Sequence, residues 1–251
     1  MSSENMPTTI ITKPISKIVI AIDGPAGAGK STVARIIAEK LGITYIDTGA
    51  MYRAITWLAI ANNLNPESDR VQLVELTKES DLQLLPAERI SATSQEKFQR
   101  VILNGKEITK EIRTPEITSL VSAVSAIGEV RHKLVAIQKE MGQNGGVIMD
   151  GRDIGSTVFP NADLKIFLVA SSRQRALRRQ KQLIQLGNKE AEATEFLEKI
   201  QKEIEHRDHL DSTREVSPLK QASDAVLIET DNLKIEEVVE KIILLARNAI
   251  R

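Results

Sequence analysis

The stretch that decides the fold is IVIAIDGPAGAGKS, residues 18–31. Its first six residues, up to Asp23, are an apolar run typical of a short buried strand, and residues 30–41 have the pattern of a helix. A glycine-rich loop between a strand and a helix binds phosphate through backbone N–H groups, while its lysine reaches the β- and γ-phosphates and its serine ligates Mg²⁺. The stretch therefore predicts a nucleoside triphosphate site formed by Gly24, Pro25, Ala26, Gly27, Ala28, Gly29, Lys30, Ser31 and Thr32.

Further short apolar runs predict partners for this strand, at residues 43–47, 146–150, 164–170 and 225–229. They are continuous rather than alternating, which is typical of strands covered on both faces. Helical patterns separate them, and the last helix places one apolar stripe towards the sheet: Ile235, Val238, Val239, Ile242 and Ile243. The pattern predicts an α/β fold in which helices flank a parallel five-stranded sheet.

The pattern changes between about residues 65 and 130. Residues 82–86 and 97–108 alternate apolar with polar side chains, and Asn104-Gly105 is a strong hairpin signal. Thr114-Pro115 then has the pattern of a helix start, with threonine as N-cap. We therefore expect a small antiparallel sheet, inserted into the parallel one, on the substrate side of the molecule.

Composition excludes several classes of protein. Lysine plus arginine equals aspartate plus glutamate, 34 each, so the chain does not bind a polyanion such as nucleic acid by bulk charge. The absence of cysteine excludes disulfides and thiolate metal sites. Residues 1–17 lack the pattern of a signal peptide, and no apolar run approaches the roughly 20 residues of a membrane span. We expect a soluble, cytoplasmic protein without membrane partners.

Two groups of arginines are candidate site residues. The first lies near helix starts, glycine turns or acidic partners and contains Arg53, Arg113, Arg131, Arg152, Arg207 and Arg214. The second lies in SSRQRALRRQK, where one helix face would carry Arg175, Arg178 and Arg179. A solvated basic face is the alternative interpretation of the second group. Beside a phosphate loop, arginines that close over a transferring phosphoryl group contribute about 10³–10⁵ in rate, which favours a site.

The segment DGRDIG, residues 150–155, follows a predicted strand and so lies at the carboxyl edge of the sheet, where open α/β folds bind ligands. Asp150 is a candidate for orienting the water ligands of Mg²⁺, and a strand-end turn held by an Asx hydrogen bond is the alternative. Arg152 and Asp153 either form a local ion pair or divide between a phosphate and a base.

In HRDHLDSTREV, Arg207, Asp211 and Arg214 recur at the spacing of one helix face. One helical salt bridge would explain them, and so would a ligand site. The three histidines have neither metal-ligand spacing nor a nucleophile nearby in the sequence, so we interpret them as structural.

Together these segments resemble the bacterial cytidylate kinase family: IDGPAGAGKS, YIDTGAMYRA, EIRTPEI, DGRDIG with VFP, KIFLVAS and HRDHLDSTRE occur in that family's order and spacing. The resemblance implies a P-loop NTPase-type core with an NMP-binding insert and a helical lid. The implied division is a tail of residues 1–16, a core of 17–64, 131–170 and 191–251, an insert of 65–130 and a lid of 171–190. It implies transfer of the γ-phosphoryl group of ATP to CMP or dCMP with Mg²⁺, and we expect a monomer.

The resemblance also implies residue roles. The acceptor's α-phosphate would be held by Arg53, Arg152 and Arg214, its cytosine by Ser122, Arg131 and Asp153, and its ribose by Arg207 and Asp211, with Thr48 as a further hydroxyl at the acceptor site. The catalytic set would be Lys30, Arg152, Arg175, Arg178 and Arg179, and the metal set Ser31 with Asp150 through water. The chain departs from family members at Leu210, Ser212 and Gly128-Glu129, where others carry more basic residues.

Base chemistry supports the cytosine assignment independently. A carboxylate at Asp153 would accept from the amino group of cytosine and repel the uracil oxygen, while Arg131 would donate to ring acceptors. Two alternatives remain: a P-loop kinase of another small acceptor, such as shikimate, and a nucleotide-dependent switch. A GTP switch would carry an Asn-Lys-x-Asp motif, which is absent from the sequence.

Overall fold

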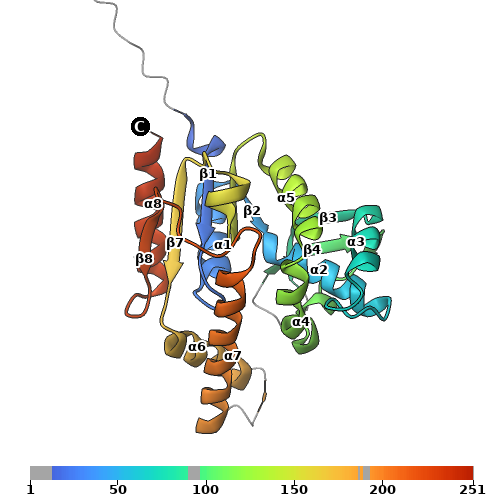
Figure 1. The fold of residues 1–251 in the computed structure, drawn as a ribbon. Coiled ribbons are helices and arrows are strands. Elements are labelled where there is room, and N and C mark those ends of the chain that lie inside the picture. Colours follow the sequence, from blue (N-terminus) through green and yellow to red (C-terminus); the bar gives the residue numbers. More distant parts are fainter. Residues whose placement is uncertain (1–12, 90–96, 186, 189–192, 251) are drawn as a thin grey trace, which may run out of the picture.

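The computed structural model describes residues 13–89, 97–185, 187–188 and 193–250, and a five-stranded sheet forms its centre (Figure 1). The strands, in the spatial order β2-β6-β1-β7-β8, are β2 (Thr44–Asp47), β6 (Val147–Gly151), β1 (Val19–Asp23), β7 (Leu164–Val169) and β8 (Val226–Glu229). All neighbours are parallel, so the carboxyl ends of the strands meet at one edge. The predicted parallel five-stranded α/β sheet is confirmed.

The central strand β1 is apolar because both of its faces are covered: Ile20, Ala21 and Ile22 are 0% exposed. On one face, α1 (Lys30–Leu41) and α8 (Ile235–Ala249) contribute to the same apolar cluster as Ile20 and Ile22. On the other face, Ala21 packs with the single π-helical turn η3 (Ile154–Val158). Most of the apolar stripe predicted for the last helix is buried or partly buried, but Ile235, the first residue of the helix, is 46% exposed.

A second apolar cluster lies beside the sheet, at the right of Figure 1. The cluster contains apolar side chains of α2 (Thr48–Ala61), α3 (Arg70–Glu79), β3 (Leu82–Arg89), β4 (Lys97–Leu103), η2 (Glu111–Arg113), α4 (Pro115–Ser125) and α5 (Gly128–Gly142). The short strand β5 (Lys106–Glu107) pairs with β4, and both of its residues are exposed. The three strands form the expected antiparallel sheet, and the β4–β5 turn has positive φ angles at Asn104 (51°) and Gly105 (76°), as a tight hairpin requires. Thr114 caps α4 by accepting a hydrogen bond from the backbone of Ile117. The cluster reaches beyond residues 65–130 on both sides because α2 and α5 belong to it.

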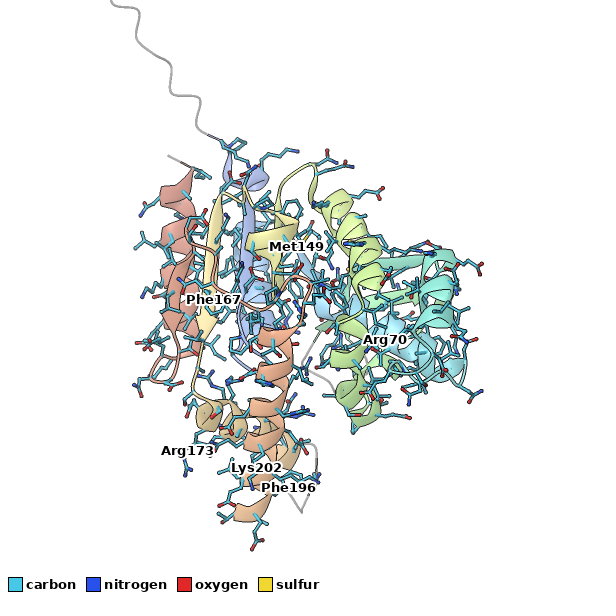
Figure 2. All side chains as sticks on the ribbon, in the orientation of Figure 1. Arg70, Met149, Phe167, Arg173, Phe196 and Lys202 are labelled. Atoms are coloured by element: carbon cyan, nitrogen blue, oxygen red, sulfur yellow. The ribbon has the colours of Figure 1, made fainter. Side chains whose placement is uncertain are left out.

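The helices α6 (Ser172–Gln185) and α7 (Thr194–Thr213) pack against each other below the carboxyl edge of the sheet in Figure 1. Figure 2 places Met149 and Phe167 within the central sheet and Arg173, Lys202 and Phe196 on this helix pair. The predicted lid, residues 171–190, coincides mainly with α6, and its residues 186, 189 and 190 lie outside the described residues. The division of the chain into core, insert and lid stays a prediction.

The described part of the chain begins at residue 13, with η1 (Ile15–Lys17) leading into β1. Residues 1–12 of the predicted tail therefore lie outside it. Within the described residues, no helix has the length and apolar content that a membrane span requires.

Candidate active site

The loop between β1 and α1, residues 24–31 and here called the phosphate loop, closes around the side chain of Lys30. Its Nζ donates to the carbonyl oxygens of Gly24 (2.7 Å) and Pro25 (2.8 Å). Gly24 has a φ of 145°, and an added Cβ would lie 2.0 Å from the carbonyl oxygen of Leu168, so glycine is required there. Burial, followed by the positive charge of Arg152, lowers the pKa of Lys30 to about 7. An arriving phosphate would stabilise the charged ammonium, and the predicted strand–loop–helix arrangement is confirmed.

Asp150, at the end of β6, lies beside the phosphate loop. Its Oδ2 accepts a hydrogen bond from the Ser31 hydroxyl (2.9 Å), and its Oδ1 accepts one from the Tyr45 hydroxyl (2.8 Å). Burial and the negative charge of Asp47 raise the pKa of Asp150 to about 6. The carboxylate is therefore directed at the loop rather than into a local Asx turn. A carboxylate and a hydroxyl at this spacing offer the oxygen atoms that a hard divalent cation prefers.

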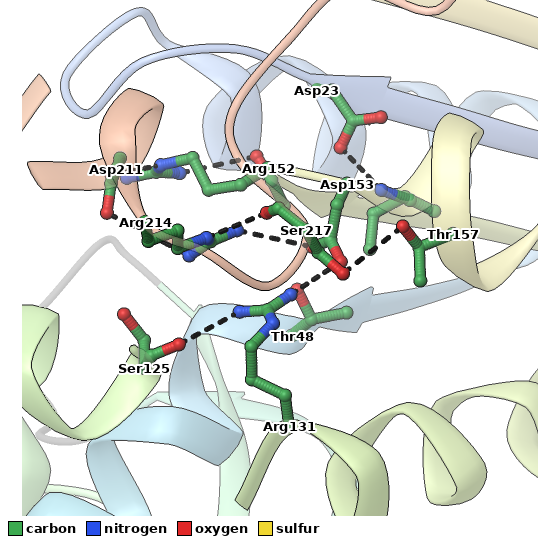
Figure 3. A network of polar contacts seen from close by, with 12 residues as sticks. Asp23, Thr48, Ser125, Arg131, Arg152, Asp153, Thr157, Asp211, Arg214 and Ser217 are labelled. Atoms are coloured by element: carbon green, nitrogen blue, oxygen red, sulfur yellow. Dashed lines mark hydrogen bonds and ion pairs between the residues drawn. The ribbon is translucent and has the colours of Figure 1, made fainter. Parts of the chain in front are cut away.

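Arg131 and Asp153 form an ion pair that is almost completely buried (Figure 3). The NH2 atom of Arg131 lies 2.5 Å from Oδ2 of Asp153, and their side chains are 2% and 6% exposed. Arg131 also donates to the carbonyl oxygen of Ser125 (3.2 Å), and its guanidinium lies 5.2 Å from the centre of the Tyr52 ring. Its Nε is buried without a hydrogen-bond partner in the structure. The two residues expected to select the base therefore meet, from elements 22 positions apart in sequence.

Neighbouring residues Arg152 and Asp153 point to different partners, so the local ion pair considered from the sequence does not form. Arg152 instead donates from Nε to Oδ2 of Asp211 on α7 (2.7 Å). Burial alone would raise the pKa of Asp211, but the charge of Arg152 and its hydrogen bond outweigh burial and lower it. Arg214 lies between the two carboxylates, 3.8 Å from Asp153 and 4.0 Å from Asp211. The four side chains form one charged network that joins β6 to the end of α7 (Figure 3).

Arg53 and Arg207 add further positive charge near this network. Burial, followed by the charge of Arg152, lowers the pKa of Arg207 to about 10, and its Nε is buried without a hydrogen-bond partner in the structure. Arg53 donates to the Thr118 hydroxyl (3.0 Å). Burial lowers the pKa of Arg53, and the charges of other arginines, including Arg152 and Arg179, act in the same direction. Guanidinium groups that depress one another's pKa in this way form a site complementary to an anion.

Comparison with known proteins identifies the family of the chain. The sequence model of the cytidylate kinase family matches residues 20–248. The chain belongs to the cytidylate kinase family. The cytidylate kinase of Ligilactobacillus salivarius is 51% identical over 228 residues, which cover 91% of this chain and 96% of that protein.

Some relatives in the cytidylate kinase family are longer. The bifunctional pantoate ligase/cytidylate kinase of Synechocystis sp. is 50% identical over 225 residues, and this chain covers only 42% of its length. Among solved structures, shikimate kinase from Bacteroides thetaiotaomicron aligns with a TM-score of 0.42 and 14% identity, covering 92% of this chain and 98% of that chain.

The arginines of α6, which helical spacing predicts on one face, reach different partners. Arg175 is buried and donates to the carbonyl oxygens of Ala170 (2.9 Å) and Ala26 (3.0 Å) and to Asp208 (2.6 Å). Arg178 donates to the carbonyl oxygen of Thr230 (2.6 Å), just beyond β8. Arg179 donates to Gln182. Arg175 thus contacts the phosphate loop, and Arg178 anchors α6 to the sheet.

The remaining predicted residues have simpler surroundings. Thr48 begins α2 and donates to the carbonyl oxygen of Asp150 (2.7 Å), which places it against the network. Ser122, on α4, is half-buried, and its carbonyl oxygen accepts a hydrogen bond from the Ser125 hydroxyl (3.0 Å). Among the described residues, no group of three or more histidine, cysteine or acidic side chains could hold a metal ion by itself.

Sequence reasoning missed three residues that position the side chains of this candidate site. Tyr45 fixes Asp150, as described above. Gln99 on β4 donates to the carbonyl oxygen of Tyr45 (3.1 Å) and accepts from the backbone N–H of Asp47 (2.8 Å), so it pairs with β2 as a neighbouring strand would. Asp23 accepts hydrogen bonds from the backbone N–H groups that follow Asp153. Tyr45 and Asp23 share one sequence signal that could have pointed to them: each is a polar side chain within or at the end of an apolar run.

Proposed function

We propose that this chain transfers the γ-phosphoryl group of ATP to CMP or dCMP, giving ADP and CDP or dCDP. The observation that carries the proposal is the buried pair of Arg131 and Asp153, linked through Arg214 and Asp211 to Arg152, beside the phosphate loop. A phosphate loop alone is common to many kinases. The buried pair adds a polar recognition element for a base, and the arginines add one for a phosphate.

Cytosine fits the polar groups of the pair. It presents an exocyclic amino donor next to a ring nitrogen that accepts, and uracil reverses both. The Asp153 carboxylate accepts from the amino group, while the guanidinium of Arg131, with its unpartnered Nε, donates to the ring acceptors. Because both side chains are buried, uracil would leave polar groups unsatisfied, and such mismatches reduce kcat/KM by about 10⁴.

Phosphoryl transfer needs positioning and charge neutralisation from these residues. The acceptor phosphate oxygen is already anionic, so no side chain has to remove a proton from it. Arg53, Arg152 and Arg214 hold that phosphate, and Arg207 with Asp211 hold the ribose. Lys30 neutralises the donor phosphates. The arginines of α6 complete the catalytic set. To take part, Arg178 has to break its hydrogen bond to the carbonyl oxygen of Thr230 and form one to a phosphate oxygen.

The same reaction requires a divalent cation on the donor phosphates, and Mg²⁺ fits the residues present. The Ser31 hydroxyl would ligate it, and the Asp150 carboxylate would orient its water ligands. When bound, the ion neutralises negative charge on the donor phosphates. Tyr45 keeps the Asp150 carboxylate turned towards this position. The Lys30 ammonium neutralises further negative charge on the donor phosphates.

An acceptor panel tests the proposal. The protein is incubated with ATP, Mg²⁺ and one of CMP, dCMP, UMP, AMP or GMP, and ADP formation is followed. We expect CMP and dCMP to be phosphorylated at least 10²-fold faster than the others. Equal rates with UMP, AMP or GMP would refute the base assignment.

A pair of variants then tests the base-reading residue. Asp153→Asn should reduce the CMP-to-UMP ratio of kcat/KM by at least tenfold because the amide no longer repels the uracil oxygen. Asp224→Asn is the matched control, since Asp224 pairs with Lys165 at the amino end of the sheet, and its ratio should equal that of the wild type. An unchanged ratio in Asp153→Asn would favour a kinase of another small acceptor.

A further inference from the structure

We propose that Asp23 is a positioning residue that couples the phosphate loop to the turn that recognises the acceptor base; this inference rests on the proposed function. Asp23 is the last residue of β1 and directly precedes the phosphate loop. Its side chain crosses to the next strand connection, where Oδ1 accepts from the N–H of Ile154 (2.8 Å) and Oδ2 from the N–H of Gly155 (2.7 Å). Both of its carboxylate oxygens are thus used by one short backbone segment.

That segment immediately follows Asp153. The strands β1 and β6 place Asp23 directly opposite Gly151, so the chain leaves β6, passes Arg152 and Asp153, and is then tied back to β1. Asp153 itself adopts φ −146° and ψ 25°, at the start of η3. The orientation of its carboxylate towards Arg131 therefore depends on backbone that Asp23 holds. Asp23 is thus joined through the backbone to the phosphate loop and through its carboxylate to residues 154–155, here called with Asp153 the base-reading turn.

The surroundings of Asp23 show that this anchor has an energetic cost. The preceding residues of β1, Ile20, Ala21 and Ile22, are 0% exposed, and Asp23 is 6% exposed. Burial raises the pKa of Asp23 to about 6, so its charged form is disfavoured there despite the two backbone hydrogen bonds. A residue kept for packing alone would be apolar, like its neighbours in the strand. Two parallel N–H groups require two acceptors, and a carboxylate provides them in one side chain.

The packing around Gly155 leaves little room for this turn to move. A Cβ added to Gly155 would lie 3.1 Å from Cδ of Lys165 and 3.4 Å from Oδ2 of Asp23. An alanine there would have to displace the turn or the stem of Lys165 by a few tenths of an ångström, and it would remove no charged group and no residue of the phosphate loop. The fold therefore offers a second way to loosen the same contact, from the acceptor side.

Three variants separate coupling from simple stabilisation. Asp23→Asn keeps the shape but leaves one N–H opposite an amide NH₂, and Gly155→Ala displaces the turn. The matched control is Asp163→Asn: Asp163 accepts from the N–H of Val19 (2.7 Å), at the opposite end of β1. Each of the three variants weakens a hydrogen bond between a carboxylate and a backbone N–H at one end of β1. Only Asp23→Asn and Gly155→Ala do so beside Asp153.

The measurements are KM for CMP, KM for ATP and the CMP-to-UMP ratio of kcat/KM. In both Asp23→Asn and Gly155→Ala we expect KM for CMP to rise about tenfold and the ratio to fall, with KM for ATP changed less than about threefold. Asp163→Asn should leave all three unchanged. An equal rise in both KM values, or no rise, in the folded variants would overturn the inference.

If Asp23→Asn does not fold, Gly155→Ala decides the question by the same criteria. Failure of the proposed function itself would appear earlier and differently, as absence of CMP phosphorylation by the wild-type protein.

Discussion

The buried pair of Arg131 and Asp153 gives an asymmetric stability prediction. Asp153 is the counter-ion of two guanidinium groups: Arg131 lies 2.5 Å from one of its oxygens and Arg214 lies 3.8 Å from the other. Removing the charge of Asp153 leaves two buried cations facing each other. Removing Arg131 instead leaves Asp153 still balanced by Arg214. The two partners of one ion pair should therefore differ in how much stability each substitution costs.

The magnitudes follow from burial. Breaking a buried ion pair by removing one partner costs about 3–5 kcal/mol, and we expect Asp153→Asn to lie at the upper end, about 4–5 kcal/mol. Arg131→Met keeps the apolar contact with the Tyr52 ring and mainly loses charged hydrogen bonds, which corresponds to about 2–3 kcal/mol. The double variant removes both charges, so it should be at least about 1 kcal/mol more stable than the sum of the single effects predicts.

Urea unfolding at pH 7.5, followed by circular dichroism without nucleotides, measures the three free energies of unfolding. The slope of unfolding against urea concentration should stay constant, so that midpoints report stability. Equal costs for Asp153→Asn and Arg131→Met, or strictly additive effects, would show that Arg214 does not share the carboxylate and would refute the reasoning.

Three further predictions concern the donor side, the insert and pH. Lys30→Ala should lower kcat about 10²–10³-fold in a coupled ADP assay, and retained full turnover would exclude the role given to the phosphate loop. Gln99→Ala should lower the free energy of unfolding by about 1–3 kcal/mol in urea, because the edge strand β2 loses two partly buried hydrogen bonds; no loss would mean that water replaces them. Burial raises the pKa of Asp23 from 3.8 to about 6. Between pH 3.8 and about pH 6, the Asp23 carboxyl is therefore protonated in the native state and ionised in the unfolded chain. The stability of the wild type relative to Asp23→Asn should therefore fall by about 3 kcal/mol as the pH rises through this range, and stay level above it; a rise instead would contradict the sign.

The elements that the sequence predicted well depend on local signals. The phosphate loop follows from glycine positions and the lysine, and the five strands follow from continuous apolar runs. The hairpin at Asn104 follows from the need for positive φ at two successive residues. Each of these signals needs only a few neighbouring residues, because backbone sterics and burial on both faces act over short stretches of chain.

The partners of the charged side chains could not be predicted in the same way. Helical spacing put Arg175 and Arg178 on a shared face, but it gave no information about what stands opposite that face: the phosphate loop for one and the residue after β8 for the other. Similarly, Arg152 and Asp153 are adjacent in sequence, and in a strand-end segment adjacent side chains point apart. Their partners come from α7 and α5, which only the assembled fold brings close.

These pairings explain how a chain with equal numbers of acidic and basic residues, 34 each, can hold a concentrated cationic site. Site arginines have carboxylate partners from other elements: Asp211 for Arg152 and Asp208 for Arg175. In the absence of substrate, these carboxylates offset the repulsion among the guanidinium groups and fix their positions. An incoming phosphate then meets arginines that are already ordered, so little further conformational entropy is lost on binding. The acidic residues of the site therefore contribute to anion binding through the order they impose, although their own charge opposes it.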